Sequence, residues 1–181
     1  MLRSRCCCAA ISAGTHFGSL YPGDPASTAV FDFLPDALLK KVENQDYVAG
    51  GAASDLWTAN TDYRQTVFFR NGGELSYFRA LLIDNSHLFG GPGWRFKESS
   101  ATGKFMSHAV SAGIANDMYI WLQKIEHLGR TNVIEETIRS VPSEWLSRVD
   151  LGALAHVSTQ LKLRSRKLAT AFPDISLRCK R

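Results

Sequence analysis

Several features that would place this chain in a specialised class are missing from its sequence. No window approaches the ~20 consecutive apolar residues that a membrane-crossing helix needs. There is also no heptad seam, internal repeat or low-complexity tract. Disorder is disfavoured, because 45% of the 181 residues are hydrophobic and 10% are aromatic, enough apolar surface to offset the entropy of ordering. The sequence therefore predicts one globular domain with a sizeable core and no membrane partner.

Cysteine is scarce and badly spaced for disulfides or zinc. Three of the four cysteines are adjacent, at positions 6–8, and the fourth is Cys179. Adjacent cysteines make a poor disulfide framework, and no C-x-x-C or Cys/His spacing suits zinc. This usage predicts a reducing, cytoplasmic location. We interpret residues 1–14 as a leader or tail, with a signal peptide or a palmitoylated basic segment as alternatives.

The excess of positive charge is small, a formal net +4, and does not by itself imply a nucleic-acid partner. Basic residues gather near the C-terminus, where residues 173–181 are predicted to form a basic tail. Such a cluster is more often a solvated helix face than a phosphate-binding surface, so nucleic acid is not the expected partner. The cluster comprises Lys162, Arg164, Arg166, Lys167, Arg178, Lys180 and Arg181.

The familiar phosphate-binding and hydrolytic motifs are absent as well. Gly103-Lys104 is followed by Phe105, and Glu98 stands where a G-x-x-x-x-G-K-[ST] loop needs its first glycine. The histidines have no H-E-x-x-H spacing, and no serine lies in a G-x-S-x-G elbow. His87 lies beside an acidic segment, and we interpret it as a local hydrogen-bonding residue and not as a metal ligand.

What the sequence does contain is an α+β pattern that is mainly helical. An Asn-Gly turn between two apolar runs predicts a β-hairpin, and apolar residues at helical spacing predict the helices on either side. The expected order is an extended connector over 15–36, helices over 36–42 and 46–58, strands over 66–70 and 75–84 around a turn at 71–74, a loop at 90–93, and helices over 119–128, 131–140, from Pro142, and over 151–171.

Two polar segments flank the predicted hairpin. The first runs from Asp55 through Asn60 and Asp62 to Gln65, and the second is Asp84-Asn85 at the end of the second strand. Because a hairpin turns back on itself, Asp62 and Asp84 are expected at the same end of it. Two such acids suit phosphoryl transfer, in which one carboxylate orients a hydroxyl and the other holds a metal. Helix capping and turn formation are the alternative explanation of the same residues.

These segments resemble the bacterial HipA-like kinase domain family, a group of atypical kinases, over roughly residues 15–172. The resemblance implies a protein-kinase-like C-terminal lobe in which the hairpin carries the acidic site. It implies phosphoryl transfer from ATP, with magnesium, to a hydroxyl of a protein or small molecule. The residues that carry the resemblance are His16–Pro25, Asp32–Asp36, Asp55–Gln65, Ile83–Asn85 and Trp94.

The resemblance also assigns roles to single residues. It makes Asp62 the catalytic aspartate and Asp84 the magnesium ligand, and it puts Arg64 near the transferred phosphate. Asn60 belongs to the same catalytic loop. Relatives have a metal-binding Asn five residues after the catalytic Asp, where this chain has Val67. The remaining predicted site residues, Gln65 and Asn85, are the candidates to bind the cofactor in its place.

The family's N-terminal lobe, a sheet with the phosphate-contacting lysine and the adenine pocket, would precede His16, and only fifteen residues stand there. We therefore interpret residues 15–172 as the C-lobe of a truncated kinase, from a truncated gene or a misplaced start codon. An active kinase would need the missing lobe from an upstream segment or another chain. The alternative is a non-catalytic pseudokinase that serves as a binding module for a protein or for nucleic acid.

Overall fold

The structure is a computed structural model that describes residues 14–15, 23–24, 26–62, 65–71, 77–96, 115–146 and 149–178. The predicted segment 1–14, the Cys6–Cys8 cluster, Cys179 and Arg64 lie outside these ranges, apart from Gly14. The elements, in order, are β1 (Thr28–Phe31), α1 (Asp36–Leu39), α2 (Gln45–Thr58), β2 (Gln65–Asn71), β3 (Arg79–Ile83), α4 (Ala115–Gly129), α5 (Val133–Arg139), α6 (Ser143–Leu146) and α7 (Leu151–Arg178).

The three strands form one antiparallel sheet in the order β1-β2-β3. The predicted pairing of β2 with β3 is confirmed, with Gln65 opposite Ile83 and Val67 opposite Leu81. The expectation of a single hairpin is wrong, because β1 pairs with β2 and adds a third strand. This strand lies inside the segment expected to be an extended connector. It has only four residues, and the strand it pairs with lies far along the chain, so local periodicity gives little sign of it.

The outer edge of β3 is covered by the segment that leads into α2. The side-chain amide of Asn44 donates to the Ala80 carbonyl at 2.8 Å and accepts from the Ala80 N–H at 2.8 Å. The Leu82 N–H donates to the Tyr47 hydroxyl at 3.4 Å. Asn44 thus takes the place of a neighbouring strand, which satisfies backbone groups that a bare edge would expose.

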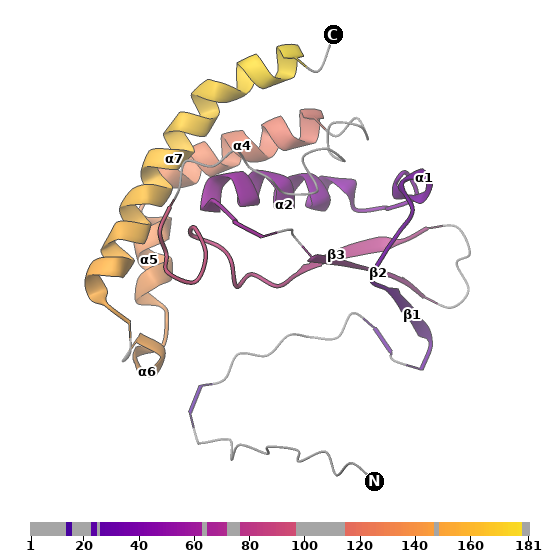
Figure 1. Cartoon of the computed structure of the whole chain (residues 1–181), viewed down its shortest axis with the longest axis horizontal. Helices are drawn as coiled ribbons and strands as arrows, with labels where there is room; N and C mark the ends of the chain where they lie inside the picture. The colour runs from indigo at the N-terminus through magenta and orange to yellow at the C-terminus, as the bar shows by residue number, and fades with distance from the viewer. Residues whose placement is uncertain are drawn as a thin grey trace.

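Helix α2 lies between the sheet and the pair formed by α4 and α7 (Figure 1). Small residues make this close packing possible: Ala49 and Ala53 are fully buried. A Cβ at Gly50 would come within 2.7 Å of the Trp121 ring. Between α2 and α4, the central core is formed by these alanines and by Met118, Leu122 and Ile125.

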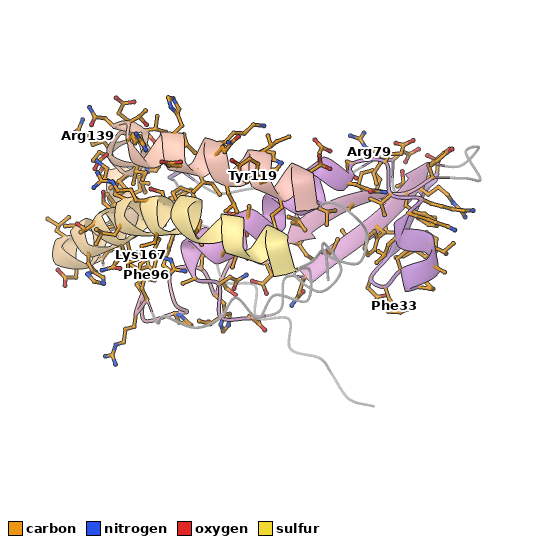
Figure 2. The ribbon with its side chains drawn as sticks, turned by 90° about the horizontal axis from the view of Figure 1, so that it is seen from above. Phe33, Arg79, Phe96, Tyr119, Arg139 and Lys167 are labelled. Carbon is orange, nitrogen blue, oxygen red and sulfur yellow. The ribbon has the colours of Figure 1, made fainter. Side chains whose placement is uncertain are left out.

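Helices α4 and α7 pack against each other, and Figure 2 shows them next to each other in the view from above. They approach closely at Gly129, where a Cβ would lie 1.8 Å from Oγ of the fully buried Ser165. Helix α7 continues to Arg178, past the predicted end near Ala171 and past Pro173. The chain is mainly helical, as expected, and within the described ranges no helix is both long and apolar enough to cross a membrane.

Candidate functional site

The first half of the candidate site begins where α2 ends. Ala59 adopts a left-handed conformation with φ of 53°, which turns the chain out of the helix. The Asn60 N–H then donates to the Asp55 carbonyl at 3.0 Å. This C-terminal turn begins the segment 59–62, which leads from the end of α2 toward the start of β2. We call these residues the catalytic loop, after the role that the resemblance predicts for Asp62.

Asn60 fixes the shape of the catalytic loop from inside. Its side chain is buried, with 7% of the residue exposed, and its amide donates to the carboxylate of Asp55 at 3.0 Å. Asp55 itself is only 4% exposed. The side-chain oxygen of Asn60 accepts the backbone N–H of Asp62 at 3.2 Å. The buried Asp55–Asn60 pair therefore determines where the Asp62 backbone lies.

The second half is the segment that follows β3, residues 84–91, which we call the metal loop after the magnesium ligand that the resemblance predicts at Asp84. It is hydrogen-bonded to the end of α2 and to the catalytic loop through three backbone bonds. Thr61 N–H donates to the His87 carbonyl at 3.2 Å, Phe89 N–H to the Thr58 carbonyl at 2.8 Å, and Gly90 N–H to the Ala59 carbonyl at 3.1 Å. The two loops are thereby held side by side.

Asp84 is the first residue of the metal loop and has a left-handed φ of 54°. One carboxylate oxygen accepts the N–H of Ser86 at 3.0 Å and its hydroxyl at 2.5 Å. The other accepts the side-chain amide of Gln65 at 3.5 Å. Since Gln65 opens β2 and pairs with Ile83, the register of the sheet brings this amide to Asp84. Gln65 and Ser86 together set the direction of the Asp84 carboxylate.

Asp62 lies in the catalytic loop with its side chain 46% exposed. Its carboxylate is 3.9 Å from Nε2 of His87, whose side chain is 39% exposed. The other ring nitrogen of His87 lies 3.4 Å from the Thr61 hydroxyl. The local hydrogen-bonding role predicted for His87 is thus confirmed. Its closeness to Asp62 could not be read from the sequence, because it depends on how the two loops meet.

Helix α7 anchors the end of α2 through three hydrogen bonds. The indole N–H of Trp57 donates to the Leu161 carbonyl at 2.9 Å. Arg164 donates through Nε to the Trp57 carbonyl at 2.8 Å and through Nη2 to the Leu56 carbonyl at 2.5 Å. A guanidinium that caps the last carbonyls of a helix also complements the negative end of the helix dipole. The catalytic loop therefore begins at a helix end whose position is fixed by hydrogen bonds to α7.

The structure brings four of the predicted site residues to one end of the β2–β3 pair. Asp62 and Asn60 come from the catalytic loop, Asp84 from the metal loop and Gln65 from the start of β2. Asn85 is exposed in the metal loop next to Asp84. No sequence pattern indicates that Arg164 binds the end of α2. That residue looked like part of a basic helix face, and only the packing of α7 on α2 gives it a role.

The donor chemistry of Asp84 suits magnesium, which takes oxygen ligands and is often bound by one or two carboxylates together with substrate phosphates. In the part of the chain that the structure describes, no group of three or more His, Cys, Asp or Glu side chains could hold a metal. A magnesium ion here would therefore complete its ligands with water molecules and, when a nucleotide is bound, with phosphate oxygens. Asp84 would contribute the protein carboxylate, and the Gln65 amide would keep it in place.

Comparisons with known proteins do not add to this geometry. No family model, curated protein or solved structure matches the chain.

Proposed function

We propose that this chain is a kinase-type phosphotransferase of the HipA-like class, acting on ATP with magnesium and transferring a phosphoryl group to a hydroxyl of a protein or small molecule. One observation carries the proposal. Two loops with an aspartate each, residues 59–62 and 84–91, are hydrogen-bonded to one another at the same end of the β2–β3 pair. The resemblance of the same residues to the family supports it.

In the proposed reaction, the acceptor hydroxyl oxygen forms a bond to the γ-phosphorus of ATP. The bond from that phosphorus to the bridging oxygen breaks, and its electron pair leaves with ADP. The hydroxyl proton passes to the carboxylate of Asp62, which is exposed enough to meet an acceptor. Magnesium, when bound, offsets the charge of the phosphate oxygens, and Asp84 is the residue proposed to hold it.

The other predicted residues either position these two carboxylates or bind phosphate groups. Asn60 fixes the backbone of Asp62 through its 3.2 Å hydrogen bond. Gln65 orients Asp84 through its amide. Asn85, adjacent to Asp84, is proposed to bind the nucleotide phosphates. Arg64, which lies outside the described residues, is proposed to neutralise the transferred phosphoryl group on the basis of the resemblance alone.

A non-catalytic binding module is the second candidate, and the observation that favours it is at position 67. Val67 lies within β2 opposite Leu81, at the position where kinase relatives have a metal-binding asparagine. A valine side chain supplies no oxygen ligand. A protein that held the nucleotide and magnesium through Asp84 without efficient transfer would be a pseudokinase that presents this surface to a partner.

The test is a transfer assay on the full chain with magnesium and ATP at millimolar concentration, which compensates for weak adenine contacts. Phosphorylated product and ADP are both measured for the parent, for Asp62→Asn and for Asp150→Asn. Asp150 is exposed and caps the start of α7, so its variant is the matched control. We expect Asp62→Asn to lower transfer by roughly 100-fold or more, which is the contribution typical of a positioned acid or base.

Equal transfer by the parent and by Asp62→Asn would contradict the proposed role of Asp62. Absence of both transfer and magnesium-nucleotide binding by the parent would contradict the kinase proposal. Binding of the magnesium nucleotide without transfer would favour the binding module, and a loss of that binding in Asp84→Asn would place it at the metal loop.

A further inference from the structure

The imidazole of His87 lies between two residues of the catalytic loop. Its Nδ1 is 3.4 Å from the Thr61 hydroxyl, and its Nε2 is 3.9 Å from the Asp62 carboxylate. Its backbone carbonyl accepts the Thr61 N–H at 3.2 Å. His87 thus contacts the catalytic loop through both its backbone and its side chain.

Gly91 leaves room for this ring. Its φ of 91° is a conformation that favours glycine. A Cβ at this position would lie 3.1 Å from the Thr61 hydroxyl and 4.0 Å from Nδ1 of His87. A side chain at Gly91 would therefore crowd the Thr61–His87 contact. Glycine at this position therefore leaves space for the imidazole beside the catalytic loop.

The two neighbours of the ring determine which of its nitrogens carries the proton. A carboxylate can only accept, so the nitrogen that faces Asp62 is best protonated. The other nitrogen can then accept the hydrogen of the Thr61 hydroxyl, which fixes the tautomer. The 3.9 Å separation is longer than a direct hydrogen bond. The attraction between the Nε2–H dipole and the carboxylate is therefore electrostatic and draws the carboxylate toward the ring.

We propose that His87 is the positioning residue for the Asp62 carboxylate, an inference that rests on the proposed role of Asp62 in phosphoryl transfer. Asn60 fixes the backbone of Asp62, and His87 holds the other end of the residue, its carboxylate. Two anchors leave the side chain little freedom to turn away from an incoming hydroxyl. Misplacement of a reacting group by about 1 Å can lower a rate by as much as 10²-fold.

Two substitutions at His87 test the contribution of each ring nitrogen separately. His87→Gln keeps an amide that can reach Asp62 in the place of Nε2, whereas His87→Asn keeps one that can reach Thr61 in the place of Nδ1. The exposed His127 at the end of α4 gives the matched control, His127→Asn. We expect kcat to fall by roughly 10- to 100-fold in His87→Asn and to be largely rescued in His87→Gln, with KM for ATP unchanged.

If His87 only joins the two loops and does not position Asp62, the two variants are expected to rank differently in activity. In that case His87→Asn would be the milder variant, since it keeps the Thr61 contact, or both variants would lose the same activity. Either outcome would overturn the inference. His127→Asn is expected to match the parent.

A double-mutant cycle of melting temperatures tests this inference without requiring any kinase activity, so it remains informative if the kinase proposal is wrong. The melting temperature is measured for the parent, His87→Asn, Asp62→Asn and the double variant. An attraction between His87 and Asp62 predicts that the loss caused by His87→Asn shrinks by about 1–2 °C when Asp62 is already replaced, as for a partly exposed pair. Additive losses would show that the two side chains do not interact and would overturn the proposal.

Discussion

Asn60 offers the sharpest test of how the catalytic loop is held. Replacing it with alanine removes two hydrogen bonds, one to the buried carboxylate of Asp55 at 3.0 Å and one from the Asp62 N–H at 3.2 Å. A hydrogen bond to a charged group contributes about 1.5–3 kcal/mol, and a neutral one contributes about 1 kcal/mol. We therefore expect Asn60→Ala to lower the free energy of unfolding by about 2–4 kcal/mol.

Urea denaturation followed by far-UV circular dichroism measures this loss. Asn132→Ala is the control, because Asn132 is exposed and makes no capping hydrogen bond with its side chain, so its loss is expected to be under about 0.5 kcal/mol. Asn60→Asp is expected to be at least as harmful as Asn60→Ala at neutral pH, since two carboxylates would then face each other in a buried site. A loss of under about 1 kcal/mol for Asn60→Ala would refute the reasoning.

Two further predictions concern the helical layer. Gly129→Ala is expected to cost about 2 kcal/mol or more in chemical denaturation, because its Cβ would overlap Ser165, and Ser165→Gly should restore most of that loss. A hydrogen bond from Lys162 holds the pKa of Glu135 below its ordinary value, so this pair stabilises the fold above the usual glutamate range and loses its effect as pH falls through the lowered pKa. Melting curves from neutral to acid pH should show a shallower acid decline for Glu135→Gln than for the parent, whereas the exposed Glu136→Gln should leave that decline unchanged.

Much of the fold follows from local patterns. Helix α2 was expected over 46–58 and spans Gln45–Thr58, and the β2–β3 pairing follows from two apolar runs around Asn-Gly. Strand β1 was missed because its stability comes from pairing with β2, a contact that no local window contains. Helix α1 ends at Leu39, short of the predicted Val42, because Val42 instead forms a β-bridge with Phe78.

The candidate site was predictable only in outline. The register of a hairpin is enough to place Asp62 and Asp84 at one end of the strand pair. The neighbours of these acids depend on how loops and helices meet in three dimensions. Neither the 3.9 Å approach of His87 to Asp62 nor the Arg164 cap on α2 has a signal in the spacing of residues. Sequence patterns specify elements well, whereas contacts between distant segments need the packed structure.

Metal-dependent stabilisation tests the central claim most directly, because it depends on the carboxylates that the structure describes and not on any adenine contact. The melting temperature of the full chain is measured with and without magnesium or manganese, for the parent, Asp84→Asn and the control Asp150→Asn. A cation that binds the folded state stabilises it by mass action, about 1.4 kcal/mol at tenfold excess over its Kd. Asp84→Asn keeps an oxygen that can accept from Ser86, so the metal-free fold should be little affected. The account predicts that the metal raises the melting temperature of the parent and of Asp150→Asn but not of Asp84→Asn. An equal rise in all three proteins, or in none, would contradict it.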